Sequence, residues 1–134
     1  MGYVVAIDAG TTGIRALVVD ERAQVVDVAY RELTQHFPRP GWVEHSPSQI
    51  WDSVQATLAE VGGRLAESGG TVAAIGLTNQ RETVVAFDRS NGRPLHPAIV
   101  WQDRRTADIC AEMKRAGHEP EVREIGRASC RERV

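Results

Sequence analysis

The segment Asp8-Ala9-Gly10-Thr11-Thr12-Gly13-Ile14-Arg15 contains the residue types that a phosphate-binding turn requires. Its two glycines permit a tight turn and close approach of the backbone, so turn amides and threonine hydroxyls can face phosphate oxygens. A guanidinium can neutralise phosphate charge, and a carboxylate at the mouth of a strand can hold the Mg²⁺ that accompanies a nucleotide. A plain hairpin turn is the alternative, because glycine is common in turns. The candidates are Gly10, Thr11, Thr12, Gly13 and Arg15 for phosphate, and Asp8 for the metal.

Two familiar phosphate-binding loops do not fit this segment. A P-loop requires Gly-Lys-Ser/Thr after the glycines, and none follows here. A dinucleotide-binding turn leads into a helix, whereas this one leads into a run that reads as a strand.

Two further clusters could hold a small polyol. Arg81 and Glu82 follow the apolar run Val72–Leu77, and loops beyond strand ends are where open α/β sheets place ligands. The guanidinium donates and the carboxylate accepts, so together they could hold neighbouring hydroxyls; a surface salt bridge is the alternative. Trp101 could pack its ring against the carbon face of a polyol, or it could belong to the core.

The elements that must position these residues begin with three strands, predicted over residues 3–7, 15–19 and 24–33. A helix should follow, because Ser46 can cap it, Pro47 suits its first position and Gln49 completes a capping-box spacing. The helical face is predicted to consist of Trp51, Val54, Leu58, Val61 and Leu65.

After Gly69-Gly70 the continuous apolar run 72–77 predicts a strand buried on both faces. A second strand is predicted over 83–87, a turn at Asn91-Gly92, and a helix over 103–114 that buries Cys110. The order is β-β-β-α-β-β-α, an α/β fold. A phosphate-binding hairpin between the first two strands of such a unit is typical of the actin-like, ribonuclease-H-like ATPase fold.

The composition and the charge exclude several classes of protein. The chain has 134 residues, 42% of them hydrophobic and 25% charged, with a formal net charge of −2, as in an ordinary globular domain. No basic excess points to nucleic acid or an anionic membrane, and no apolar run approaches the roughly twenty residues of a membrane-spanning helix. Two cysteines form neither a disulfide framework nor a metal cluster, so we expect a cytoplasmic protein.

The chain resembles the FGGY family of carbohydrate kinases, and within it the glycerol kinases, over about residues 3–123. Four stretches occur in family order and carry the resemblance: Ala6–Thr12, Pro40–His45, Ile75–Thr83 and Ile99–Arg105. Glycerol kinases commonly have Ser where this chain has Gly13, so side-chain contacts at that position differ. Residues 124–134 do not match the family's continuation, and we expect them to be a disordered or artefactual tail.

The resemblance implies a partial N-terminal kinase domain over residues 1–123 and a reaction between ATP, with Mg²⁺, and glycerol to give ADP and sn-glycerol 3-phosphate. Gly10 to Gly13 and Arg15 would contact phosphates, and Asp8 would lie near Mg²⁺. Arg81, Glu82 and Trp101 would contact glycerol. The family's catalytic aspartate has no counterpart in this chain, so we expect the chain alone to be inactive. The complete enzyme could be a homo-oligomer. The alternatives are another sugar or polyol kinase of the family, such as a pentulose kinase, and a non-catalytic actin-like half-domain that binds nucleotide.

Overall fold

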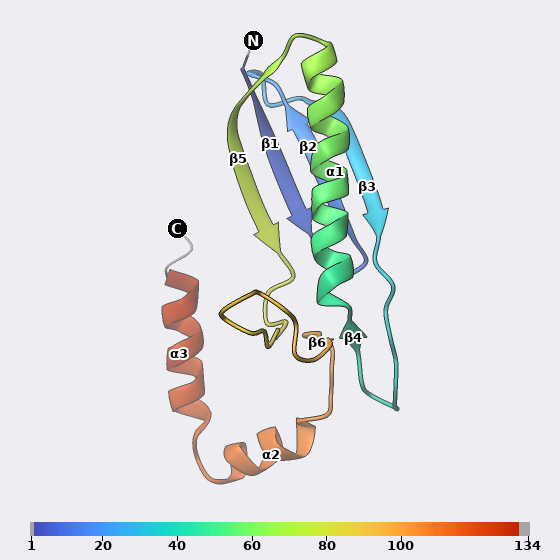
Figure 1. Cartoon of the computed structure of the whole chain (residues 1–134). Helices are drawn as coiled ribbons and strands as arrows, with labels where there is room; N and C mark the ends of the chain where they lie inside the picture. Colours follow the sequence, from blue (N-terminus) through green and yellow to red (C-terminus); the bar gives the residue numbers. More distant parts are fainter. Residues whose placement is uncertain (1, 132–134) are drawn as a thin grey trace. The chain divides into compact units, whose positions relative to one another are not determined.

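The computed structural model describes the backbone of residues 2–131, which form two compact units that divide after Asp103. The first unit is built on a four-stranded sheet with the order β3-β2-β1-β5 (Figure 1). Its strands are β1 (Gly2–Ala9), β2 (Gly13–Val19), β3 (Val25–Glu32) and β5 (Thr71–Asn79). Strand β1 pairs antiparallel with β2 and parallel with β5. The three predicted strands, the helix and the strand after it are present in that order, with one additional two-residue strand, Glu44–His45, before the helix.

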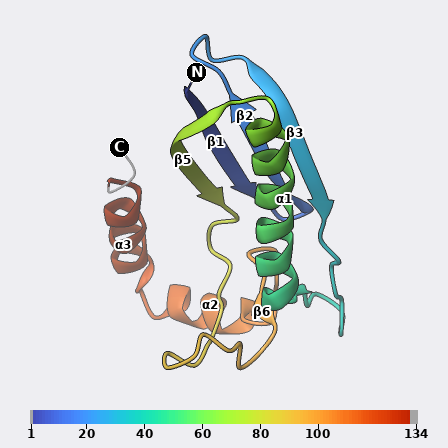
Figure 2. The same cartoon turned by 45° about the horizontal axis from the view of Figure 1, so that its top comes forward.

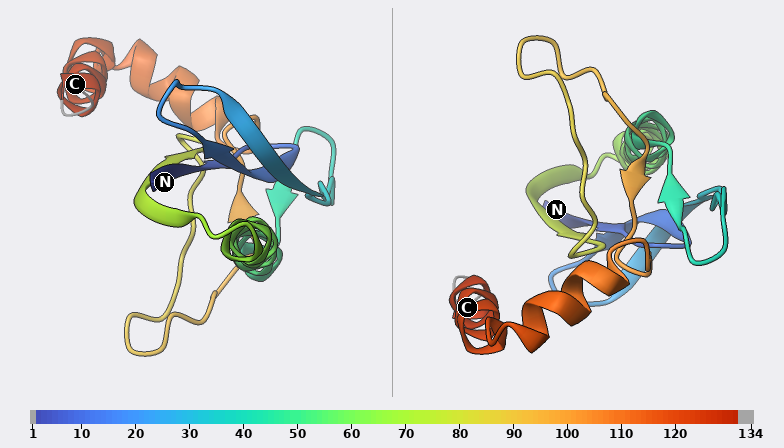
Figure 3. Two further views of the ribbon diagram at one scale, coloured as in Figure 1. Left: turned by 90° about the horizontal axis from the view of Figure 1, so that it is seen from above. Right: turned by 90° about the horizontal axis from the view of Figure 1, so that it is seen from below.

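Helix α1 (Pro47–Glu67) lies over one face of this sheet, as Figures 2 and 3 show from two directions. Alternate residues of β1 and β2 are buried beneath it, as in a half-buried sheet. One buried cluster joins Val5, Ala16, Val18 and Ala29 to Val61 and Leu65 of the helix. A second contains Ile7, Ala9, Ile14 and Leu33, packed against Ile50, Val54 and Leu58.

The start of α1 is as predicted, but its buried face is not. Ser46 caps the helix, since its Oγ accepts a hydrogen bond from the Gln49 amide at 3.3 Å. Trp51, predicted to face the core, is 62% exposed. At 100° per residue, the first turn points Ile50 rather than Trp51 along the line of Val54, Val61 and Leu65, and Ile50 fills the core position.

Strand β5 was predicted to be buried on both faces, and this is wrong for the described chain. All of its residues are exposed, including Ile75 at 62% and Leu77 at 71%. The physical reason is its place at the edge of the sheet, because α1 packs mainly over β2 and β3 and leaves the faces of β5 uncovered.

The predicted strand over 83–87 is also wrong. Only isolated bridges form there, between Val84 and Ile99 and between Phe87 and Pro94. Two very short strands, β4 (Glu44–His45) and β6 (Ala98–Ile99), pair antiparallel instead. The predicted turn is present, since the Gly92 amide donates to the Asp88 carbonyl at 2.7 Å.

The second unit contains α2 (Ala107–Arg115) and α3 (Glu119–Arg131). Helix α2 begins later than predicted, because Asp103 accepts a hydrogen bond from the Val43 amide and is held in the preceding loop. Cys110 is exposed rather than buried, since none of the α2 residues is buried. Helix α3 includes residues 124–131 of the predicted tail, and residues 132–134 lie outside the described ones. Within the described residues, no helix has both the length and the apolarity to cross a bilayer.

Candidate active site

The predicted phosphate-binding segment is the hairpin between β1 and β2. It is closed by the Gly10 amide, which donates to the Gly13 carbonyl at 3.0 Å, so Thr11 and Thr12 lie at its tip. The Thr12 carbonyl accepts from the Leu33 amide at 3.0 Å and from the Tyr30 hydroxyl at 3.2 Å. The Gly10 amide is already used in this bond, and the amides of Thr11 and Thr12 lie at the tip, where a phosphate would approach.

The two glycines of the hairpin are needed for close approach. A Cβ at Gly10 would lie 3.2 Å from the Gly13 carbonyl oxygen and 3.8 Å from Oδ1 of Asp8. A Cβ at Gly13 would overlap the ring of Tyr30. The Asp8 carboxylate therefore lies beside the hairpin, on the side that a larger residue at position 10 would crowd.

Asp8 belongs to a row of side chains on the sheet face opposite α1. Its register partners are Arg15 on β2 and Thr78 on β5, and it alternates with buried Ile7. Arg15 is exposed, and its guanidinium carbon lies 5.4 Å from the centroid of the Tyr30 ring. This row holds one carboxylate and one guanidinium close to the hairpin.

Asp8 is suited to be the single carboxylate by which a protein binds Mg²⁺. Among the described residues, no group of three or more His, Cys, Asp or Glu side chains could hold a metal ion by itself. Magnesium in phosphoryl-transfer sites keeps several waters and takes one or two carboxylates together with substrate phosphates. A lone Asp8 beside a phosphate-binding turn has the donor chemistry of that arrangement.

The predicted polyol residues Arg81 and Glu82 lie in the loop that follows β5. This loop starts beside the hairpin, because the Gln80 amide donates to the Ala9 carbonyl at 2.8 Å. Arg81 and Glu82 are both exposed, and Glu82 has a φ of +65°, in the left-handed region that non-glycine residues seldom adopt. Such outliers persist where the surroundings hold them, and they gather at functional sites.

Trp101 joins the loop to the hairpin. Its side chain is half exposed rather than part of the core, at 54%. Its indole Nε1–H donates to Thr11 Oγ1 at 2.9 Å, and its backbone amide donates to Thr83 Oγ1 at 3.3 Å. The structure thus brings a predicted polyol residue and a predicted phosphate residue into direct contact across ninety positions of the chain.

Three residues that the sequence analysis did not assign support the loop. The Thr83 hydroxyl donates to Gln80 Oε1 at 3.2 Å, and Gln80 Nε2 lies 3.2 Å from Nδ1 of His45. His45 is 1% exposed, and its Nε2 has no hydrogen-bond partner among the described residues. Burial, with a smaller effect from His36, lowers the pKa of His45 from 6.5, so the neutral ring is favoured. The sequence signal that could have identified them is the family resemblance of two stretches, since His45 lies in Pro40–His45 and both Gln80 and Thr83 lie in Ile75–Thr83.

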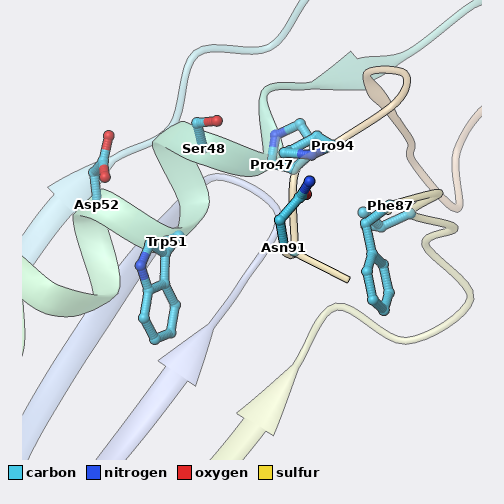
Figure 4. Close-up of a pocket in the computed structure, with 9 residues that line it drawn as sticks. Pro47, Ser48, Trp51, Asp52, Phe87, Asn91 and Pro94 are labelled. Carbon is cyan, nitrogen blue, oxygen red and sulfur yellow. The ribbon is translucent and has the colours of Figure 1, made fainter. Parts of the chain in front are cut away.

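A separate groove lies at the start of α1 and contains none of the predicted site residues (Figure 4). It has a volume of about 460 Å³, with Trp51 and Asp52 on the helix side and Phe87 and Asn91 on the loop side. The predicted site residues come together elsewhere, at the hairpin, the Gln80–Thr83 loop and Trp101, and these three parts form the candidate active site.

Residues 3–132 match the sequence model of the N-terminal domain of the FGGY family of carbohydrate kinases. A glycerol kinase from Cereibacter sphaeroides (strain KD131) is 56% identical over 124 residues, which are 92% of this chain and 25% of that protein. The chain thus spans about a quarter of the length of the curated relatives it matches.

Solved structures of the same kind share the fold. A Plasmodium falciparum glycerol kinase with ADP superposes with a TM-score of 0.77 at 34% identity, over 84% of this chain and 23% of that one. A xylulose kinase from Rhodospirillum rubrum superposes with a TM-score of 0.80 at 38% identity, over 90% of this chain and 25% of that one. The α/β fold predicted for the chain is that of these kinases.

Proposed function

This chain belongs to the FGGY family of carbohydrate kinases, and from that premise we propose that it supplies the N-terminal part of a glycerol kinase. The reaction transfers the terminal phosphoryl group of ATP to glycerol. The bond from that phosphorus to the ADP oxygen breaks, a bond to a glycerol oxygen forms, and the glycerol proton passes to a base. That base is the family's aspartate, which we assign to no residue of this chain.

One observation carries the proposal. The phosphate hairpin follows β1 and the polyol loop follows β5, and these are adjacent parallel strands whose carboxyl ends meet at Ala9 and Asn79. Ligands of open α/β sheets bind outside the carboxyl ends of parallel strands. A donor phosphate and an acceptor hydroxyl held on these two loops would be neighbours, which is what an in-line transfer requires.

The polyol-binding part consists of Arg81, Glu82 and Trp101. The guanidinium donates to hydroxyl oxygens and the carboxylate accepts from hydroxyl protons, so the pair can hold two adjacent hydroxyls of glycerol in one orientation. The half-exposed indole offers an apolar face to the carbon chain.

The phosphate-binding part consists of Gly10 to Gly13 and Arg15. Backbone amides at the tip and the threonine hydroxyls would receive phosphate oxygens, and the Arg15 guanidinium would balance their charge. When bound, Mg²⁺ neutralises charge on the nucleotide phosphates, and Asp8 would hold it. We therefore propose ATP and Mg²⁺ as the cofactors. We also propose that the complete enzyme works in the reducing cytoplasm, as a homo-oligomer.

A pentulose kinase is the second candidate, and the 38% identity to the Rhodospirillum rubrum xylulose kinase structure favours it. A chimera decides between the two. In this chimera, residues 3–123 of the chain replace the matched segment of the Cereibacter sphaeroides glycerol kinase. ADP formation is measured with glycerol and with D-xylulose, and faster turnover of D-xylulose would overturn the assignment to glycerol.

Replacing Arg81 tests the site itself. Arg81→Ala removes charged hydrogen bonds to the polyol, so the KM for glycerol of the chimera should rise about 10- to 100-fold. Arg22→Ala is the matched control, because Arg22 is exposed in the turn at the other end of β2. An unchanged KM for glycerol in Arg81→Ala would contradict the assigned role.

A further inference from the structure

Trp101 has two N–H groups, the indole and the backbone amide, and each donates a hydrogen bond to a different segment of the site. The indole N–H donates to the Thr11 hydroxyl of the hairpin at 2.9 Å, and the backbone N–H donates to the Thr83 hydroxyl of the loop at 3.3 Å. A role confined to packing against a polyol would need the face of the ring, but not the indole N–H. Packing against a polyol therefore does not explain why the indole N–H is directed at the Thr11 hydroxyl.

We propose that Trp101 is a positioning residue that fastens the phosphate hairpin to the polyol loop and orients the Thr11 hydroxyl toward phosphate. The proposal rests on the proposed function, since it assigns Thr11 to phosphate. It adds to that function a physical link between the two substrate sites.

The chemistry of the Thr11 hydroxyl explains the orientation. A hydroxyl has one proton to donate and two lone pairs that accept. The indole N–H occupies one lone pair, so the O–H bond must point elsewhere, and at the hairpin tip a phosphate oxygen is the acceptor it would meet. Donation from the indole also polarises the hydroxyl and strengthens its own donation, as in any chain of hydrogen bonds.

The other end of the link is anchored in a buried side chain. Thr83 donates to Gln80 Oε1, so the Gln80 amide group turns its N–H₂ toward His45. Nδ1 of His45 then accepts, and the ring proton lies on Nε2. Since His45 is buried and Thr11 lies at the hairpin tip, two sets of hydrogen bonds, joined by the covalent frame of Trp101, connect a fixed point to the phosphate residue.

The link is tested first by NMR of the 134-residue chain, a readout that needs no kinase activity. Thr11→Val removes the hydroxyl with little change of shape, so exchange of the Trp101 indole N–H with water should accelerate roughly 3- to 10-fold. Thr11→Ser keeps the hydroxyl and should leave the exchange rate near that of the parent. Equal indole exchange in all three proteins would overturn the proposal.

The same link is tested from the tryptophan. Trp101→Phe keeps an aromatic face and removes the N–H, so amide exchange at Thr11 and Thr12 should accelerate. Trp51→Phe is the matched control, because Trp51 is exposed on α1 and lines the separate groove at the start of that helix. Identical hairpin exchange in the two variants would count against the link.

Kinetics of the chimera separate positioning from polyol binding. Trp101→Phe should lower kcat/KM for ATP about 3- to 10-fold while it changes the KM for glycerol less than about 2-fold, since the ring remains. A change confined to the KM for glycerol would refute the positioning role. If the parent chimera phosphorylates no polyol, the proposed function fails while the NMR result still decides whether the link exists.

Discussion

Gly13→Ala should destabilise the chain, although alanine is ordinarily better than glycine in a strand. The new Cβ would overlap the Tyr30 ring, which must swing away. The movement breaks the bond from the Tyr30 hydroxyl to the Thr12 carbonyl, about 0.5–1.5 kcal/mol, and the Arg15–Tyr30 contact, about 0.5–1 kcal/mol. Alanine in a strand returns about 0.5–1 kcal/mol. The balance is a loss of about 1 kcal/mol.

The sign of the effect should reverse when Tyr30 is removed first. In a Tyr30→Leu background there is no ring to displace, so Gly13→Ala should stabilise the chain by about 0.5–1 kcal/mol. Gly76→Ala is the matched control: a Cβ at Gly76 on β5 would meet nothing within 4 Å, so it should stabilise in both backgrounds.

Urea unfolding followed by far-UV circular dichroism measures these differences as shifts of the midpoint at constant slope. In thermal unfolding, 1 kcal/mol corresponds to about 3–5 °C for a chain of this size. The reasoning is refuted if Gly13→Ala stabilises the parent chain as Gly76→Ala does. It is equally refuted if the loss persists unchanged in the Tyr30→Leu background.

Three other predictions follow from the site. Thr12→Ala in the chimera removes a hydroxyl from the phosphate contacts and should lower kcat/KM for ATP about 3- to 10-fold, measured by ADP formation; equal values would favour a plain turn. Glu82→Gly removes the carboxylate assigned to the polyol, so the KM for glycerol of the chimera should rise at least about 10-fold, measured by ADP formation; an unchanged KM would contradict that role. His45 has a lowered folded-state pKa, so below about pH 6.5 the unfolded chain binds a proton that the folded chain does not. Between about pH 6.5 and 5, above the carboxyl range, stability should therefore fall with falling pH in the parent chain and in the control His96→Gln, and the part of this slope due to His45 should be absent in His45→Gln.

Local patterns predicted the elements that local energetics determine. Short apolar runs bounded by turn residues predicted β1 and β2, and alternation of apolar and polar residues predicted β3. A capping serine followed by proline predicted the start of α1. The face of α1 was missed by one position at its first turn, because the spacing from Val54 back to Trp51 is as helical as the spacing back to Ile50. A count of three- and four-residue spacings does not distinguish the two, whereas the rotation of 100° per residue brings Ile50 closer to the line of Val54, Val61 and Leu65, and Ile50 packs inward.

Non-local pairing explains the other differences. The run 72–77 is apolar enough for a central strand, but burial is decided by neighbours, and β5 lies at an edge of the described sheet. Strands β4 and β6 have two residues each, too few for any alternation to appear. For the site, the types of residue in the hairpin and the loop indicated their chemistry, whereas the contact between Thr11 and Trp101 depends on how distant segments return to the sheet.

Gly13 and Glu82, both in the candidate site, depart from local preference in opposite directions. Gly13 begins β2 without a side chain, because the Tyr30 ring occupies the space that a Cβ would need. Glu82 has the backbone conformation for which glycine is favoured, yet carries a long charged side chain. If position 82 served only to turn the chain, glycine would be the more stable choice. The loop is held on either side of it, through Gln80 to Ala9 and through Thr83 to Trp101, and this anchoring can maintain the strained residue. A carboxylate on a doubly anchored loop is what precise presentation of one group to a small polyol requires.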